Sequence, residues 1–419
     1  MMKPFEIHWK VKALQSHSRW MVLGLCCLFF FSLGVTVASF GPLLPELSVL
    51  NQVDLSRMGQ IFTFYFLGSL ISQILSGPFS DRFGEKPLML AATLLLMVSV
   101  ATLPFSHTFS LSLLLFSLTG LGGGAIVLAT NVLIARVYAD RSVSALNLLN
   151  LFFGVGAFLS PALVGLIAGQ TGNGRQILWL VSALLALQVV LFGWLRIPPP
   201  ARTPQANAGT GMRFLLRSRL VWLLAFLLML YVGVENGFGG WITVYMQRTA
   251  NLPYEQAALS ASAFWLALTA GRLVTVGLGM RLSAMRILAL SLGGALAGSL
   301  LMVLGRGNLP LSTAGILLTG FSFASIFPST VSLSSAFFPE QAGRAMSIIN
   351  GMASIGAMVL PWLQGVLLNT ISPTASTLLT LGGVAGMVLL LAAVRPLTRS
   401  TAPSSLPEAA GGFSDVLPR

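Results

Sequence analysis

The segment GPFSDRFGEK, residues 77–86, decides the fold of this chain. It is a short charged stretch between two apolar runs, 58–76 and 87–104, and each run is close to the roughly 20 residues that a helix needs to cross a hydrocarbon layer. Gly77 permits close helix approach, Gly84 permits a tight turn, and Asp81 can accept hydrogen bonds from a facing helix N-terminus or from an arginine. The pattern predicts a polar turn between two membrane helices.

The half of the sequence that contains this segment is repeated 200 residues further along the chain. The matching positions are Gly77, Gly120, Asp140, Ala145, Asn150, Gly156, Pro161 and Gly165, which correspond to Gly277, Gly320, Glu340, Ala345, Asn350, Gly356, Pro361 and Gly365. An apolar half-chain repeated in the same sense is typical of a secondary transporter built from two parallel membrane bundles that rock about a central site. The second copy of the charged segment, from Gly277 through Arg281 to Arg286, has no acid at the position of Asp81, so the two copies differ in charge.

The composition places the whole chain in a lipid bilayer. Hydrophobic residues make up 55% of the sequence, charged residues make up 8%, and the mean hydropathy is +0.85. A water-soluble fold of this size would have too few polar side chains to cover its surface. The formal charge of +13 does not indicate nucleic acid, because the basic residues are scattered between apolar runs instead of gathered on one face. The sequence predicts a polytopic all-α membrane protein.

Twelve runs are long enough to cross the membrane. They are 20–44, 58–76, 87–104, 110–136, 143–169, 176–195, 220–246, 256–280, 285–304, 311–337, 343–369 and 373–394. They predict two six-helix bundles, 20–195 and 220–394, related by the parallel repeat. A linker rich in proline, glycine and arginine separates the bundles at 196–219. A cytoplasmic segment, 1–19, precedes them, and a disordered cytoplasmic tail, 395–419, follows them.

The basic residues predict the orientation. With both termini in the cytoplasm, 19 of the 24 lysines and arginines fall on the cytoplasmic side. Arg57, Arg175, Arg248 and Arg306 fall outside, and Arg272 lies within a span. The apolar run of the first helix is not followed by a small-residue cleavage site, so we expect this helix to be retained. The chain is predicted to reside in the cytoplasmic (inner) membrane.

The segment 77–86 resembles the cytoplasmic loop signature of the major facilitator superfamily, G-x-x-x-D-R-x-G-R/K-R/K. It departs from that signature only at Glu85, which occupies the first of the two closing basic positions. The resemblance extends from about residue 20 to about residue 395, and it implies a segment that latches the two bundles together in the outward-open state. The alternative is an ordinary charged turn. The residues of this gate motif are Gly77, Asp81, Arg82, Gly84 and Lys86.

Glu235 is the one acid deep in a span, and Arg272 is the one base. Each costs at least ~2.5 kcal/mol at a helix centre, so both should face the bundle interior or a water-filled cavity. A carboxyl at this depth makes Glu235 the candidate for proton coupling. At 1.5 Å per residue the two charges differ in depth by about 9 Å, so direct pairing requires long rotamers or helix tilt. In the alternative, Glu235 hydrogen-bonds to helix neighbours and Arg272 extends to the inner interface.

The residues around Glu235 form a motif of their own. The stretch 231–241 resembles helix 7 of the fucose-permease-like branch of the superfamily, which includes sugar:proton symporters. Amides bind hydroxyl groups, and aromatic faces pack on the apolar face of a sugar ring. The alternative for Trp241, and the preferred interpretation for Tyr245, is an aromatic belt at the membrane surface. The candidates for the substrate cavity are Arg272, Asn236, Trp241, Tyr231, Gln73, Tyr65, Ser32, Thr36 and Gln364, although serine and threonine in membrane helices usually bond to backbone or neighbouring helices.

These features predict a secondary active transporter that moves a small polar organic solute, such as a sugar, by alternating access with proton coupling. A proton-driven exporter of drug-like or amphiphilic compounds is the alternative, and a transport-inactive membrane sensor comes third. The chain lacks the acids that fucose-type transporters carry in helices 1 and 4, so coupling rests on Glu235. The sequence has no nucleophile–base–acid set, metal-ligand cluster or phosphate-binding loop, so it predicts no enzyme, metal or cofactor. The expected partners are the solute, a proton and the bilayer, with no nucleic acid, and the expected functional unit is a monomer.

Overall fold

The computed structural model describes residues 16–195, 197 and 212–400. The predicted terminal segments and linker lie largely outside the described residues. Of the linker, the structure describes a short helix, α9 (Met212–Arg217). Twelve helices in the described part are long and apolar enough to cross a membrane, which confirms the predicted number and the all-α class.

The N-terminal bundle holds six of these spans. Its helices are α2 (Ser16–Leu50), α4 (Gln60–Phe83) with the short α3 (Leu55–Met58) before it, α5 (Glu85–Thr102), α6 (Phe109–Val137), α7 (Ser142–Thr171) and α8 (Gln176–Trp194). The C-terminal bundle holds the other six. Its helices are α10 (Arg219–Ala250), α11 (Tyr254–Gly279), α12 (Ala284–Leu304), α13 (Leu309–Phe323) followed by α14 (Ile326–Phe337), α15 (Ala342–Val366) and α16 (Pro373–Ser400).

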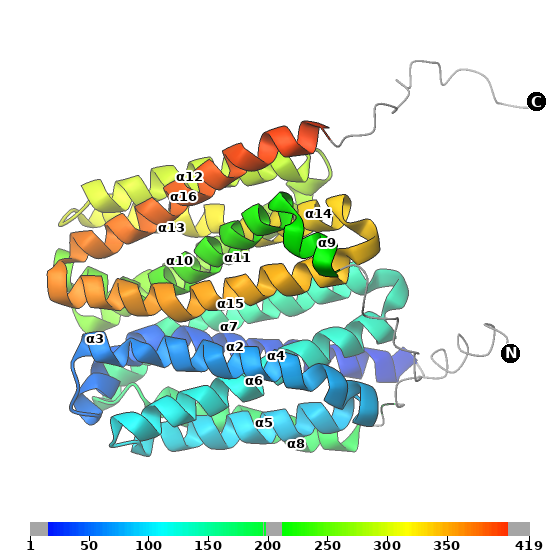
Figure 1. Ribbon diagram of the computed structural model, residues 1–419. Helices are drawn as coiled ribbons and strands as arrows, with labels where there is room; N and C mark the ends of the chain where they lie inside the picture. The colour runs from blue at the N-terminus through cyan, green and yellow to red at the C-terminus, as the bar shows by residue number, and fades with distance from the viewer. Residues whose placement is uncertain (1–15, 196, 198–211, 401–419) are drawn as a thin grey trace, which may run out of the picture.

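Figure 1 shows the two bundles lying side by side, with helices running in nearly the same direction in both. The first described residues of α2, the last of α16 and the linker helix α9 lie at one end of the molecule. We call this end the terminal face. The loops that join α2 to α3, α7 to α8, and α10 to α11 lie at the other end, which we call the distal face.

The repeated glycines pack matching helix pairs in the two bundles. A Cβ added at Gly156 of α7 would lie 2.2 Å from the Phe31 carbonyl oxygen of α2. A Cβ added at Gly356 of α15 would lie 1.9 Å from the Met229 carbonyl oxygen of α10. Both positions therefore need glycine because a helix backbone fills the place of a side chain. The repeat encodes the contact between the first and fifth helix of each bundle.

The tenth span, predicted as one run at 311–337, is interrupted. Helix α13 ends at Phe323 and α14 begins at Ile326. Pro328 has no backbone N–H to donate to the Ala324 carbonyl, so the regular hydrogen-bond ladder stops there. The hydroxyl group of Ser325 contacts that of Ser291 on α12. The matching helix of the first bundle, α6, is continuous, so the two bundles differ at this level.

Candidate functional site

The two bundles touch in the distal half of the molecule. Among the described residues, three hydrogen bonds join them. The Tyr254 hydroxyl donates to the Pro42 carbonyl at 2.7 Å, the Thr63 hydroxyl donates to the Met358 carbonyl at 2.6 Å, and the Ala162 amide donates to the Ser262 hydroxyl at 2.9 Å. Counted along their helices, these residues lie between mid-span and the distal face.

Glycines bring the helix backbones together at this distal contact. A Cβ added at Gly41 of α2 would lie 2.4 Å from the Gly240 carbonyl oxygen of α10. The ring of Phe62 occupies the place of a side chain at Gly240, and the indole of Trp241 does so at Gly59. These contacts close the distal side of the space between the bundles.

The terminal half is different. A Cβ at Gly77, Gly277, Gly343 or Gly351 would meet nothing within 4 Å. The close helix approach predicted at Gly77 is therefore absent in this conformation. The described contacts between the bundles extend from the distal face to mid-span, where Gly154 of α7 meets Thr269 of α11. Among the described residues, the hydrogen bonds that join the two bundles all lie toward the distal face.

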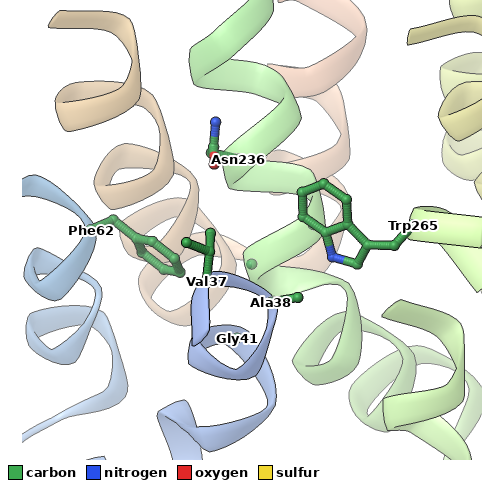
Figure 2. Close-up of a pocket in the computed structure, with 8 residues that line it drawn as sticks. Val37, Ala38, Gly41, Phe62, Asn236 and Trp265 are labelled. Atoms are coloured by element: carbon green, nitrogen blue, oxygen red, sulfur yellow. The ribbon is translucent and has the colours of Figure 1, made fainter. Parts of the chain in front are cut away.

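A small pocket lies where the bundles meet. It has about 10 Å³ of free space, enough for about one water molecule and far below the roughly 300 Å³ at which ligand pockets usually begin. Figure 2 shows Phe62 and Trp265 reaching toward it from opposite sides, with Val37 and Ala38 of α2 between them and Asn236 of α10 above. The pocket therefore lies between the two bundles, with its amide on the C-terminal bundle. We call the region around it, between the bundles at mid-span, the central space.

Glu235 lies beside this pocket, 9% exposed, on the turn of α10 that carries Asn236. Its carboxyl group is close enough to interact electrostatically with Arg272 of α11 and with the hydroxyl group of Tyr231. Among the described residues the ion pairs are Arg136 with Glu85 and Arg175 with Glu46, so Glu235 and Arg272 are neighbours and not a direct pair. The Arg272 Nη1 atom is buried and has no hydrogen-bond partner.

The aromatic candidates of α10 are buried. Trp241 is 1% exposed, and its indole N–H donates to the Pro361 carbonyl at 2.7 Å. The belt interpretation preferred for Tyr245 is wrong, because that residue is 3% exposed and its hydroxyl group donates to the Met302 carbonyl. Tyr231 packs edge-on against Phe323, beside the break in the tenth span. Burial and hydrogen bonds inside the bundle place these rings away from the lipid.

The candidates on the first two helices mostly have partners inside the N-terminal bundle. Ser32 accepts a hydrogen bond from the Gln188 amide at 2.6 Å, and the Thr36 hydroxyl donates to the Ser32 carbonyl. Tyr65 is buried with its ring against Phe40. The structure gives these side chains no described contact with Glu235 or Arg272. Their role in binding a solute stays a prediction.

The last two candidates lie apart from the central pocket. Gln364 lines a second pocket inside the C-terminal bundle, together with Trp241, Tyr245 and Ser376, and its amide nitrogen lies 3.3 Å from the Thr380 hydroxyl. Gln73 is exposed on the terminal half of α4, and its amide lies 3.5 Å from the Ser69 hydroxyl. The structure thus groups Glu235, Asn236, Arg272 and Tyr231, and it separates them from these glutamines.

The gate motif closes the end of α4 with contacts inside its own bundle. Gly84 has a φ of 86°, which explains the glycine in this turn. The Lys86 ammonium group donates to the carbonyl oxygens of Gly193 and Leu195 at the end of α8, both at 2.7 Å. Arg82 lies over the ring of Phe83. The side chain of Asp81 lies outside the described residues, so its latch contact stays a prediction.

The departure at Glu85 has a structural partner. Glu85 is 2% exposed, and its carboxylate lies 2.8 Å from the Arg136 guanidinium at the end of α6. A basic residue at this position would face Arg136 with the same charge. The acid therefore replaces a repulsive contact with an ion pair between α5 and α6.

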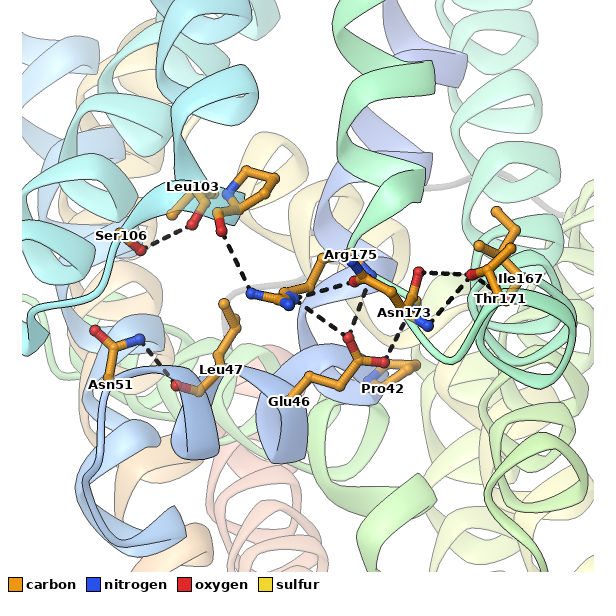
Figure 3. A network of polar contacts seen from close by, with 12 residues as sticks. Pro42, Glu46, Leu47, Asn51, Leu103, Ser106, Ile167, Thr171, Asn173 and Arg175 are labelled. Atoms are coloured by element: carbon orange, nitrogen blue, oxygen red, sulfur yellow. Dashed lines mark hydrogen bonds and ion pairs between the residues drawn. The ribbon is translucent and has the colours of Figure 1, made fainter.

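A second polar network holds the distal end of the N-terminal bundle (Figure 3). The Glu46 carboxylate accepts hydrogen bonds from the amides of Gly174 and Arg175, and it forms an ion pair with the Arg175 side chain at 3.5 Å. Arg175 also donates to Asn173 and to the Pro104 carbonyl. The network fixes the α7–α8 loop to Glu46 of α2. Glu46 lies one turn beyond Pro42, whose carbonyl oxygen accepts the hydrogen bond from Tyr254.

Several residues of the central pocket were missed from the sequence. Trp265 is the main one, and the signal for it is spacing, because Trp265, Thr269 and Arg272 follow one face of α11. Phe62 and Gly240 were missed because apolar residues and glycines fill every span. Their contact joins two bundles, and the sequence carries no pattern for such a contact.

Two six-helix bundles with charged residues at mid-span define the class of this protein, a membrane transporter. The chain belongs to the Major Facilitator Superfamily, whose family model matches residues 24–309 and 255–418. It is a multi-pass integral membrane protein and a transporter of that family, not an enzyme.

Curated relatives of the chain include transporters of several solutes. The human "Sodium-dependent glucose transporter 1" is 26% identical over 377 residues, which are 82% of this chain and 73% of that protein. The "Glucose/mannose transporter GlcP" of Bacillus subtilis is 23% identical over 89% of this chain and 93% of that protein. The "4-hydroxybenzoate transporter PcaK" of Pseudomonas putida is 24% identical over 84% and 87%.

Solved structures resemble the fold. A crystal structure of a mutant of the nucleoside transporter NupG has a TM-score of 0.75 and covers 90% of this chain and 99% of that chain. At 15% sequence identity this likeness shows the twelve-helix fold alone.

Proposed function

We propose that this transporter moves a small polar organic solute across the cytoplasmic membrane by alternating access, and that Glu235 couples the movement to a proton. The observation that carries the proposal is the placement of Glu235 and Arg272. These two mid-span charges are electrostatic neighbours within the C-terminal bundle, and Asn236, which follows Glu235 on α10, lines the pocket between the bundles. Charged groups within membrane spans mark substrate and ion pathways.

The surroundings of Glu235 support a proton as the coupling ion. The titratable and charged groups that interact with it are Tyr231 on its own helix and Arg272 on α11. The other helices packed on α10, which include α15, α16, α2 and α14, add no charged group to this set among the described residues. A carboxyl group with one cationic neighbour can take and release a proton as that neighbour moves or finds another partner.

The distal contact supports alternating access. The bundles touch through short hydrogen bonds and glycine contacts at one end, so a rocking motion must break this contact and form another at the terminal face. If both termini are cytoplasmic, as the distribution of basic residues predicts, the contact seen in this structure lies on the extracellular side. Each chain contains both bundles and the whole central space, so we propose that a monomer is the functional unit.

The solute has to bind both a polar amide and aromatic rings, because the pocket is lined by both. Asn236 offers an amide for hydroxyl groups, while Phe62 and Trp265 offer aromatic faces for an apolar ring surface. Glucose and mannose, which the names of two relatives give as their solutes, match this description and make a sugar the first solute to test.

The test is proton flux and solute uptake in proteoliposomes, for wild type, Glu235→Gln and the control Asp54→Asn. Asp54 is an exposed acid before α3 that caps no helix through its side chain. A panel of sugars and amphiphilic cations separates uptake of a polar solute from export of drug-like compounds. We expect Glu235→Gln to lose proton-driven accumulation and to keep solute exchange, while Asp54→Asn behaves as wild type. Unchanged uphill uptake in Glu235→Gln would refute the coupling role.

A further inference from the structure

Among the described residues, the two charged side chains near the pocket lie on one bundle. Glu235 and Arg272 belong to the C-terminal bundle, as does the neutral amide of Asn236, whereas the facing side chains Val37 and Phe62 are apolar. Phe153 of α7 extends this apolar wall, with its ring 6.4 Å from that of Trp265. A solute in this space therefore meets its electrostatic partners on one side only.

Arg272 lies on the wall of this space. On α11 it follows Trp265, which lines the pocket, and Thr269, which fills the place of a side chain at Gly154 of the other bundle. Residues spaced by four and three fall on one helical face, so Arg272 continues the face that looks across to the N-terminal bundle. The preceding residue, Gly271, faces a different direction and packs on the Phe321 carbonyl oxygen of α13. The side chain is partly exposed, as expected for a residue at the edge of the central space.

The guanidinium group of Arg272 is not fully used within the protein. Its Nη1 atom is buried without a hydrogen-bond partner, and its carboxylate neighbour Glu235 is too distant for an ion pair. A buried donor without a partner costs about 1–3 kcal/mol, and more when the group is charged. A group of a bound solute that has two hydrogen-bond acceptor atoms would remove this cost.

The charge balance depends on the proton. With Glu235 ionised, its charge and that of Arg272 cancel. When Glu235 takes a proton, the wall carries one uncompensated positive charge in a low-dielectric space. An anion bound to Arg272 restores neutrality, whereas a neutral solute leaves the charge in place.

We propose that the solute carries a carboxylate group, that Arg272 binds this group when Glu235 is protonated, and that anion and proton cross together without net charge. This inference rests on the proposed function and narrows its solute to organic monoanions. One negative charge and one proton sum to zero, so transport responds to a pH difference and not to the membrane potential. A sugar acid and an aromatic acid both satisfy the chemistry, and the experiment separates them.

The test uses two matched solute pairs, glucuronate with glucose, and 4-hydroxybenzoate with 4-hydroxybenzyl alcohol. Thermal stabilisation of the purified protein is measured first, and uptake into proteoliposomes follows, under an imposed pH difference or an imposed potassium diffusion potential. We expect at least one carboxylate to bind about tenfold or more tightly than its neutral partner, to accumulate with the pH difference, and to generate no current.

Three variants locate the effect. Arg272→Gln should remove the preference for the anion, Arg272→Lys should keep part of it, and Arg281→Gln, an exposed arginine just beyond the same helix, should leave it unchanged. The partial effect of the lysine variant separates a charge contact from a folding defect in the glutamine variant.

Each outcome decides the inference. Equal or tighter binding of both neutral partners overturns it, as does an unchanged anion preference in Arg272→Gln. Proton-driven uptake of glucose with an inward current would refute the inference that the solute is an anion, and it would leave the proposed transporter function intact. If solute transport by the wild type is not coupled to protons, this result would instead count against the proposed function itself.

Discussion

Replacing Gly41 by alanine should open the distal contact. The new Cβ atom would lie 2.4 Å from the Gly240 carbonyl oxygen and 2.9 Å from the Gly240 Cα atom. Carbon and oxygen atoms of neighbouring backbones usually stay at least about 3.3 Å apart, so the helices must separate by about 1 Å. The obstructing atoms belong to the backbone of α10, which cannot turn aside as a side chain can.

The expected magnitude follows from this overlap. Overpacking of this kind costs about 1–3 kcal/mol in the closed state. A state in which the distal contact has opened does not pay this cost, so the closed population should fall about 5- to 150-fold relative to the open one. Gly24→Ala on the same helix is the matched control, because its Cβ would meet nothing within 4 Å. The control should be neutral or slightly stabilising, since alanine favours a helix by about 1 kcal/mol over glycine.

The measurement is the distance between spin labels at Asp54 and Arg306. Both side chains are exposed near the distal face, one on each bundle, and the native Cys26 and Cys27 are buried. Gly41→Ala should shift the distribution to longer distances, while Gly24→Ala should match the wild type. If the two variants give the same distances as the wild type, then the glycine contact does not control distal closure and the argument is wrong.

Three further predictions concern the gate and the distal contact. Glu85→Gln removes the ion pair with Arg136, and because the carboxylate is buried we expect a loss of about 1.5–3 kcal/mol, seen as a lower melting temperature; an unchanged temperature would contradict the role of Glu85. Tyr254→Phe removes the donor to the Pro42 carbonyl and should weaken distal closure by about 1 kcal/mol, measured as faster labelling of a distal cysteine; equal labelling rates would speak against this bond. Asp81→Asn should shift cysteine accessibility toward the inward-open state if the gate motif latches the outward-open one, and the latch would be rejected if accessibility stayed the same.

Much of the fold was predictable because a bilayer leaves few choices. Each apolar run of sufficient length must satisfy its backbone hydrogen bonds internally, so the run becomes a helix. This reasoning predicted twelve spans, and the structure has helices at all twelve positions. It did not predict the break between α13 and α14, although Pro328 is visible in the sequence, because membrane helices often tolerate proline without a break.

The candidate site was only partly predictable. Charge is so rare within the spans that Glu235 and Arg272 stood out, and the structure brings them close together. Ser32 was a weaker prediction for the opposite reason. Hydroxyl groups are frequent in membrane helices, and its partner Gln188 lies 156 residues away, where no local pattern points to it.

The sequence by itself determined the number of helices, the duplicated bundle and the two central charges. These depend on length, repetition and the high cost of charge in lipid, and all three can be read along the chain. Only the tertiary structure decided which face of each helix looks inward and which ends of the bundles touch. Lipid tails are as apolar as a bundle interior, so a membrane helix carries no strong apolar stripe to reveal its orientation. The contact of Gly41 with Gly240, which closes the distal face, depends on that orientation in two helices at once.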